Sequence, residues 1–238
     1  MDSVKGKVYA VTGLGGIGLA VARQLHAQGA LLSLADLSET VLSTARQTIE
    51  TEFGASIGLT ITTTALDISN VAAVQDWIAS TVSHFGRLDG AANMAGTIGK
   101  KHGTGKFVDQ DDAEWDMLMR VNVTGLMYCL RAQLRAITAT APGGRVVSLM
   151  RRHAVSGLTK SVSKEVGPEI RVNAVAPGSI QTPLLEMAKE IQGGINIPPS
   201  SIPRIGTGEE VAQTVVFLLS DASSYTTGQI LSVDGGWE

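Results

Sequence analysis

Short apolar runs alternate with longer stretches of mixed polarity along almost the whole chain. The apolar runs resemble strands that are buried on both faces of a parallel sheet, because they are nearly continuous rather than alternating with polar residues. The predicted strands are Val8–Val11, Leu31–Ala35, Leu59–Ala65, Gly90–Ala95, Arg145–Met150, Arg171–Ala176 and Ile230–Val233.

The stretches between these runs favour helices, because their apolar residues recur at helical spacing. The predicted helices are Leu19–Gln28, Glu39–Phe53, Val71–Phe85, Asp112–Thr138, His153–Val166 and Glu209–Ser220. The alternation predicts an α/β fold, a doubly wound parallel sheet of about seven strands with helices on both faces. Right-handed crossovers then place a ligand site at the carboxyl ends of the strands.

No linker-like tract and no repeat interrupts this pattern, so we expect residues 1–238 to form a single dinucleotide-binding domain. Two segments without a regular pattern, 97–110 and 179–203, are predicted loops on the ligand side of the sheet. Either segment is a candidate substrate lid.

A glycine-rich turn joins the first predicted strand to the first predicted helix. Gly13, Gly15 and Gly18 have the Gly-x-Gly-x-x-Gly spacing of the dinucleotide fingerprint. One glycine makes the turn, one lets backbone approach a pyrophosphate, and one lets the helix pack on the strand. The positive end of the helix dipole then faces the phosphates. A tight strand–helix turn without a ligand is the alternative.

The second predicted strand leads into Asp36, about twenty residues beyond the last glycine of the turn. A carboxylate at this offset accepts the ribose hydroxyls of a dinucleotide and repels the 2′-phosphate of NADP(H). Leu37 follows and supplies no cation for a phosphate. The sequence therefore favours NAD(H), and NADP(H) stays open.

Composition narrows the class of protein. The chain is 44% hydrophobic, has a net charge of -3 and contains no basic block, so we expect neither a nucleic-acid nor a membrane partner. Cys129 is the single cysteine, which excludes an internal disulfide and indicates a reducing compartment. No signal peptide, membrane span or metal-ligand spacing is visible. We expect a cytoplasmic enzyme that acts on a small molecule.

Further motifs follow in order along the chain. They are Asp67-Ile68, Asn93-Met-Ala-Gly96, Val121-Asn122-Val-Thr-Gly125, Arg171-Val-Asn-Ala-Val-Ala-Pro-Gly178, Thr182-Pro183 and Ser232-Val-Asp-Gly-Gly236. Together with the turn Thr12-Gly13…Gly16-Ile17-Gly18, they resemble the signatures of short-chain dehydrogenases/reductases over nearly the whole length.

The resemblance implies a nicotinamide-dependent oxidoreductase that forms a homodimer or homotetramer through the helices Asp112–Thr138 and His153–Val166. It implies Asn122, Ser148 and Arg152 as catalytic candidates, although a serine that ends a strand is often only structural. The implied cofactor contacts are Thr12, Gly13, Gly15, Gly16, Ile17, Gly18, Asp36, Asp67, Ile68, Asn93, Ala95, Gly96, Arg152, Pro177, Gly178, Ile180 and Thr182.

The chain departs from the family pattern in two places. The glycine turn is one residue shorter than the family's. The family's catalytic Tyr-x-x-x-Lys is absent, because none of Tyr9, Tyr128 and Tyr225 has a lysine four positions later. Arg152 stands where the family has this lysine. An arginine there can hold ribose hydroxyls, but its higher pKa and its geometry make the exchange non-conservative.

Two explanations for the missing tyrosine stay open. Either the printed sequence omits residues between Met150 and Arg151, or the protein has lost the segment. A strand-to-helix connection usually needs several residues, and this one contains no turn former, which favours an omitted segment.

A site without the tyrosine favours an iminium substrate, since hydride transfer neutralises the cation and no oxygen needs a proton. The acidic residues between Asp109 and Asp116 are candidates for stabilising such a cation, and capping of the following helix is their simpler role. The expected function is therefore NAD(P)H-dependent reduction of a small, largely apolar metabolite of secondary metabolism.

Three other functions stay open. The first is an ordinary carbonyl reductase whose tyrosine segment is missing from the printed sequence. The second is a bifunctional reductase and [4+2] cyclase, or Diels–Alderase, similar to those of fungal alkaloid biosynthesis, whose pocket holds the reacting ends together. The third is a non-catalytic dinucleotide-binding protein.

Overall fold

The computed structural model describes residues 4–54, 59–149, 153–194 and 200–237. Within them, seven parallel strands form one sheet in the order β3-β2-β1-β4-β5-β6-β7. The strands are β1 (Val8–Thr12), β2 (Leu31–Asp36), β3 (Ile61–Ala65), β4 (Gly90–Asn93), β5 (Arg145–Leu149), β6 (Arg171–Pro177) and β7 (Ile230–Val233). This architecture confirms the predicted fold class.

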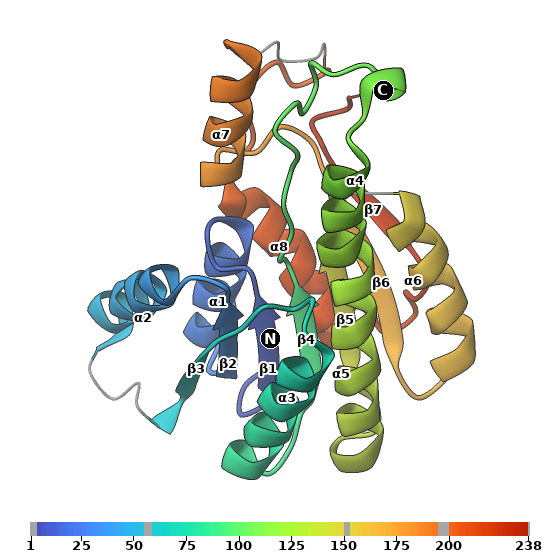
Figure 1. Ribbon diagram of the computed structural model, residues 1–238. Helices are drawn as coiled ribbons and strands as arrows, with labels where there is room; N and C mark the ends of the chain where they lie inside the picture. The colour runs from blue at the N-terminus through green and yellow to red at the C-terminus, as the bar shows by residue number, and fades with distance from the viewer. Residues whose placement is uncertain (1–3, 55–58, 150–152, 195–199, 238) are drawn as a thin grey trace.

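Helices connect successive strands and cover both faces of the sheet (Figure 1). They are α1 (Ile17–Ala27), α2 (Glu39–Phe53), α3 (Val71–Phe85), α4 (Asp112–Met119), α5 (Leu126–Thr140), α6 (His153–Val166), α7 (Pro183–Gln192) and α8 (Gly208–Leu219). Short helical turns add η2 (Phe107–Asp109), the π turn η3 (Arg120–Gly125) and η4 (Asp221–Ser223).

Both faces of the sheet are buried over the inner strands, from β2 through β1, β4 and β5 to β6, as the nearly continuous apolar runs predict. Alternate residues of β1 point to opposite faces, so Tyr9 and Val11 pack in one core and Val8 and Ala10 in the other. The first core is closed by α1, α2 and α8, and the second by α3, α5 and α6. Strands of this kind have no solvent face, which fixes their place in the middle of the molecule.

The strand order reverses at β1, which pairs with β2 on one side and with β4 on the other. Chain connections leave these strands in opposite directions, and this leaves a crevice beyond their carboxyl ends. The segment after β4 and the helix α7 both lie at this end of the molecule (Figure 1). The fold thus places the predicted ligand-side segments together.

The predicted loop 179–203 contains a helix, α7, and the prediction of an irregular segment is wrong for residues 183–192. Thr182 caps the helix by accepting a hydrogen bond from the Leu185 amide at 3.3 Å, and Pro183 occupies the first turn. Gly193 ends the helix in the left-handed conformation, with φ of 69°.

The predicted helix Asp112–Thr138 is interrupted by the π turn η3 and ends at Thr140. At this turn Gly125 lies against Ile68, whose Cγ1 atom would be 2.9 Å from an added Cβ. Periodicity does not reveal such a turn, because one wide turn hardly shifts the apolar positions. The third strand begins at Ile61 rather than at the exposed Leu59.

No helix in the described part of the chain is long and apolar enough to cross a membrane. The same residues contain no group of histidine, cysteine and acidic side chains that could hold a metal ion. The connection from β5 to α6, which includes Arg152, lies outside the described residues.

Candidate functional site

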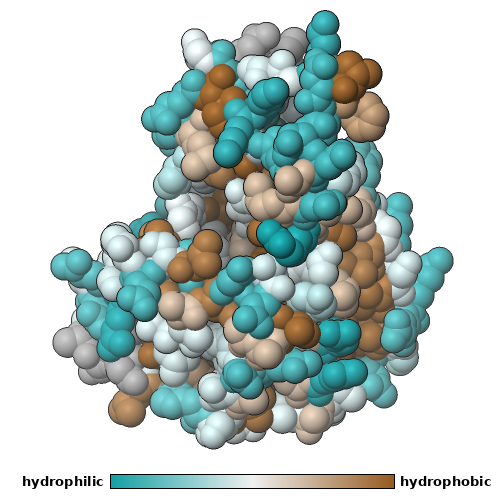
Figure 2. Space-filling model, in the orientation of Figure 1, coloured by the Kyte–Doolittle hydropathy of each residue, from teal (hydrophilic) through white to brown (hydrophobic). Residues whose placement is uncertain are grey.

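Two adjoining cavities open at the carboxyl ends of the central strands. The first, which we name the turn-side cavity, has a volume of about 510 Å³ and gathers residues from the glycine turn, β2, the segment after β3 and the segment after β4. Predicted contacts that line it are Gly13, Gly15, Gly16, Ile17, Gly18, Asp36, Asp67, Ile68, Ala95, Gly96 and Thr182. Figure 2 shows a recess on this face of the molecule, below the end that carries α7.

The second cavity, named here the lid-side cavity, has a volume of about 590 Å³ and lies beneath α7. Pro177, Gly178 and Ile180 line it, as do apolar side chains of α7. Ile17, Thr97 and Thr182 line both cavities, so the two meet at these residues. A long ligand in the turn-side cavity would therefore present one end to a smaller molecule held under α7.

The glycines of the turn have different steric surroundings. Gly13 has φ of 77°, and an added Cβ would lie 2.5 Å from the Ala95 Cα. A Cβ on Gly18 would overlap the carbonyl oxygen of Gly13. Gly15 has no atom within 4 Å of its Cβ position. Gly13 and Gly18 are thus required by packing within the protein, whereas Gly15 leaves room for a ligand to approach the backbone.

The Asp36 carboxylate is fixed at the edge of the turn-side cavity. Its Oδ2 accepts a hydrogen bond from the Leu14 amide at 2.7 Å, and its Oδ1 accepts one from the Ser38 amide at 3.0 Å. Arg23 lies away from this edge, where its guanidinium contacts Glu52 at 2.6 Å and Glu209 at 3.1 Å. Arg23 is therefore not placed to contact a phosphate at this edge.

Asn122 lies in the π turn and holds the segment that separates the two cavities. Its Oδ1 accepts from the Thr97 amide at 2.9 Å, and its Nδ2 donates to the Thr97 carbonyl at 3.0 Å. The side chain is buried, and Thr97 rather than Asn122 lines the cavities. Asn122 therefore acts on the site geometry through Thr97.

Thr12, Asn93 and Ser148 lie below the cavities and line neither of them. Thr12 accepts a bond from the Ala95 amide at 3.4 Å, and the Asn93 amide exchanges two hydrogen bonds with Gln133, at 2.9 and 2.8 Å. Ser148 is 1% exposed. Thr12 and Asn93 thus hold the chain at the ends of their strands, and the Ser148 hydroxyl is buried without a hydrogen-bond partner among the described residues.

The acidic residues before α4 serve the helix and the neighbouring segment. The Asp111 Oδ1 accepts from the Glu114 amide at 2.8 Å, which is an N-cap, and the Glu114 carboxylate accepts from the Lys100 amide at 2.6 Å. Both residues line a separate cavity between α4 and the segment 97–110. The capping role is confirmed for Asp111, and neither Asp111 nor Glu114 lines the two cavities of the candidate site.

The tyrosines of the described residues lie outside the candidate site. The Tyr9 hydroxyl donates to the Leu219 carbonyl at 3.3 Å, and burial raises its pKa to about 12. Tyr225 is fully exposed, and Tyr128 belongs to α5. Among the described lining residues of the lid-side cavity, the titratable side chains are His102, His153 and Asp234. Motif spacing did not reveal these histidines, because they are far apart in the sequence.

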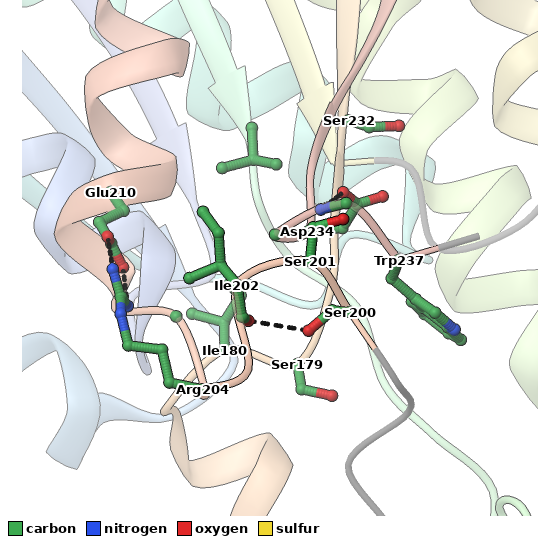
Figure 3. Close-up of a pocket in the computed structure, with 14 residues that line it drawn as sticks. Ser179, Ile180, Ser200, Ser201, Ile202, Arg204, Glu210, Ser232, Asp234 and Trp237 are labelled. Carbon is green, nitrogen blue, oxygen red and sulfur yellow. Dashed lines mark hydrogen bonds and ion pairs between the residues drawn. The ribbon is translucent and has the colours of Figure 1, made fainter.

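A third cavity of about 390 Å³ adjoins the lid-side cavity (Figure 3). The two share Ser179, Ile180, Ser232, Asp234 and Trp237. On its other side Arg204 contacts Glu210 at 2.6 Å. The wall between the two cavities thus comes from residues that follow β6 and from β7 with the chain after it.

Comparison with known proteins adds to this geometry. The family profile described as Enoyl-(Acyl carrier protein) reductase matches residues 12–151 and 150–238. The chain is 41% identical to "Short-chain dehydrogenase/reductase ABA4" of Pyricularia oryzae, over 98% of this chain and 92% of that protein. It is 34% identical to the levodione reductase of Leifsonia aquatica, over 97% and 93% of the two chains.

Solved structures share the whole fold. The crystal structure of levodione reductase superposes with a TM-score of 0.87 at 30% identity and covers 97% of each chain. The structure of an NAD⁺-bound xylitol dehydrogenase superposes with a TM-score of 0.88 at 27% identity, over 98% of this chain and 99% of the other.

Both sequence comparisons contain a discontinuity. The alignment with the Pyricularia protein spans 254 positions, more than the 238 residues of this chain, so that protein carries residues that have no counterpart here. The two segments of the family match meet at residues 150–151.

Proposed function

This chain belongs to the short-chain dehydrogenase/reductase family, and on that premise we propose that it transfers hydride between NAD(H) and a small, largely apolar metabolite. The observation that supports this most is the meeting of the two cavities at Ile17, Thr97 and Thr182. A dinucleotide in the turn-side cavity would place its reactive ring at this junction, where it supplies or accepts the hydride.

The residues of the turn-side cavity fit a dinucleotide. Open space at Gly15 gives room for a pyrophosphate beside the first turn of α1, whose N–H groups favour anions. The fixed Asp36 carboxylate suits ribose hydroxyls, and Ile68 offers an apolar surface to a base. The NAD⁺ in the similar xylitol dehydrogenase supports the choice of NAD(H).

Asp36→Ala tests the cofactor. We expect the wild-type chain to bind NADH more tightly than NADPH, and the variant to lose most of this preference, because the 2′-phosphate no longer meets a carboxylate. The two dissociation constants are measured by quenching of intrinsic fluorescence. Asp112→Ala is a control with the same change of charge on α4, outside both cavities. Equal affinity of the wild-type chain for both nucleotides would contradict the proposal for NAD(H).

The discontinuity at residues 150–151 supports a catalytic segment that differs from the family pattern. An iminium is the second candidate substrate, favoured by the absence of tyrosine from the described cavity linings. A carbonyl is the candidate that the named activity of levodione reductase supports. None of the relatives reported above is named a cyclase, and no described contact favours cyclisation.

Intact mass separates the two explanations of the discontinuity. A protein purified from its natural source with a mass near 24.8 kDa, allowing for any processing at its ends, lacks the segment. A heavier protein, with extra residues between Met150 and Arg151 by peptide mapping, contains the segment. A tyrosine within those residues would restore ordinary carbonyl reduction.

Turnover separates an enzyme from a non-catalytic binder. We expect oxidation of NADH to accompany reduction of a carbonyl or iminium probe, followed by absorbance at 340 nm. Binding of NADH without turnover of any such probe would favour a sensor or a partner subunit.

A further inference from the structure

Reduction of a carbonyl group requires a proton for its oxygen, and the donor must face the cavity that holds the substrate. The phenols of the described residues do not meet this condition, because Tyr9 is buried beneath Leu219 and Tyr225 is on the outer surface. Tyr128 lines neither the turn-side nor the lid-side cavity. Among the described residues, the donor therefore has to be another kind of side chain.

The lining of the lid-side cavity leaves few candidates. Most of its described residues are apolar, glycine or hydroxyl-bearing, and the titratable ones are His102, His153 and Asp234. The Asp234 Oδ1 accepts from the Gly236 amide at 3.0 Å, and a carboxylate is ordinarily ionised at neutral pH and has no proton to give. Imidazole is the side chain whose ordinary pKa lies in the physiological range.

The two histidines occupy different parts of the lining. His102 belongs to the outer segment 97–110 and also lines the separate cavity beside α4. Its carbonyl accepts from the Gln192 side chain of α7 at 3.3 Å, which places it where two ligand-side segments meet. His153 is the first residue of α6, next to the end of the central strand β5, and Leu149 of that strand lines the same cavity.

We infer that His153 is the proton donor in carbonyl reduction, an inference that rests on the proposed function. In this step the carbonyl carbon gains the hydride from the reduced dinucleotide, and the carbon–oxygen π bond becomes an O–H bond to the proton of the imidazolium. The dinucleotide is oxidised, the carbonyl is reduced to an alcohol, and His153 is left as a neutral imidazole. In alcohol oxidation the neutral imidazole accepts the proton.

The charged groups around His153 come from several elements. Asp234 follows β7, and His102 comes from the segment 97–110. The strands β5 and β6 pack against α6. Their charged residues are Arg145 and Arg171, which lie at the amino ends of these strands, opposite to the carboxyl ends where the cavity opens. Asp234 is thus the described carboxylate that shares the cavity with His153.

His153→Gln tests the inference with two probes. Levodione is a ketone and needs a proton, whereas 2-methyl-1-pyrroline in its iminium form already carries one. We expect the variant to lose at least about a hundredfold in kcat/KM for levodione and to retain reduction of the pyrroline.

His84→Gln, on α3 and outside both cavities, is the matched control and should change neither reaction. Retention of levodione reduction in His153→Gln would overturn the inference, as would transfer of the defect to His102→Gln. Reduction of the pyrroline but not of levodione by the wild-type chain would also overturn it. Failure of the wild-type chain to bind NADH or to reduce either probe would instead contradict the proposed function.

Discussion

Gly13 and Gly15 belong to the same four-residue turn but have different steric surroundings. Gly13 is confined by the Ala95 backbone and by its left-handed conformation, whereas Gly15 borders only the turn-side cavity. The fingerprint spacing marks both positions equally. The distinction between a glycine needed for the fold and one needed for a ligand requires the neighbouring strand.

Exchange of each glycine for alanine should separate these two roles. Gly13→Ala should lower the free energy of unfolding by more than about 1 kcal/mol, because an added Cβ is strained in the left-handed region and collides with Ala95. Gly15→Ala should leave stability within about 0.5 kcal/mol and weaken NADH binding at least tenfold. Urea unfolding and nucleotide titration measure the two effects. Loss of stability in Gly15→Ala would contradict this division.

Cys129 shows how burial changes the reactivity of a side chain. It is a core-facing residue of α5 with 1% exposure, and burial raises the pKa of its thiol to about 12. The thiolate is the reactive form, so the native protein should resist alkylation by iodoacetamide at pH 8 and become reactive in denaturant. Mass spectrometry follows the modification. Rapid labelling of the native chain would show that the core around α5 opens readily.

At the scale of the element, α7 and α8 show how capping decides where helices begin. Thr207 caps α8 by accepting from the Glu210 amide at 3.3 Å, and the Glu210 carboxylate accepts from the Thr207 amide at 2.8 Å. This reciprocal pair is a capping box. Thr207→Ala should cost about 1 kcal/mol of stability, measured by urea unfolding. No change would mean that packing against α1 alone fixes the start of α8.

The capping box of α8 also predicts that the stability of the fold depends on pH. Hydrogen bonds from Arg204 and from the Thr207 amide lower the pKa of Glu210 from 4.5 to about 2. A lowered pKa stabilises the fold above the ordinary value, and this contribution is lost as the pH falls from about 4.5 through about 2. Glu210→Gln should therefore be less stable than the wild-type chain at pH 7, and the difference should shrink below pH 4.5. A difference that is constant from pH 7 to pH 3 would contradict this account.

The sequence and the structure agree best for the buried strands and least for the ligand-side segments. Six of the seven predicted strands start at the residue observed, because continuous apolar runs have only one way to be buried on two faces. The helix α7 was missed although Thr182-Pro183 and Gly193 mark its ends. Its signals are short and local, and the motif Thr182-Pro183 also resembles a cofactor contact.

At the scale of the whole molecule, we predict a homodimer or homotetramer in which α5 and α6 form an interface. Light scattering should give two or four times 24.8 kDa. Arg131→Glu on α5 changes the charge of an exposed residue, whose guanidinium lies 5.5 Å from the Tyr128 ring, and should weaken the assembly. Lys5→Glu, outside the helices, is the charge-matched control. A monomer, or an equal effect of both variants, would contradict the predicted interface.

The sequence by itself determined the parallel sheet, the glycine turn and the place of Asp36 at the end of β2, because each depends on residues close together in the chain or on a continuous apolar pattern. Tertiary structure decided which predicted residues line the two cavities. Thr12 and Asn93 belong to the same motifs as residues that line the cavities, yet neither lines a cavity, and Ser148 of β5 lines neither cavity as well. Tertiary structure also brought His102 and His153 into one cavity. No sequence spacing encodes this, because their proximity depends on how β4, β5 and α7 pack around the crevice.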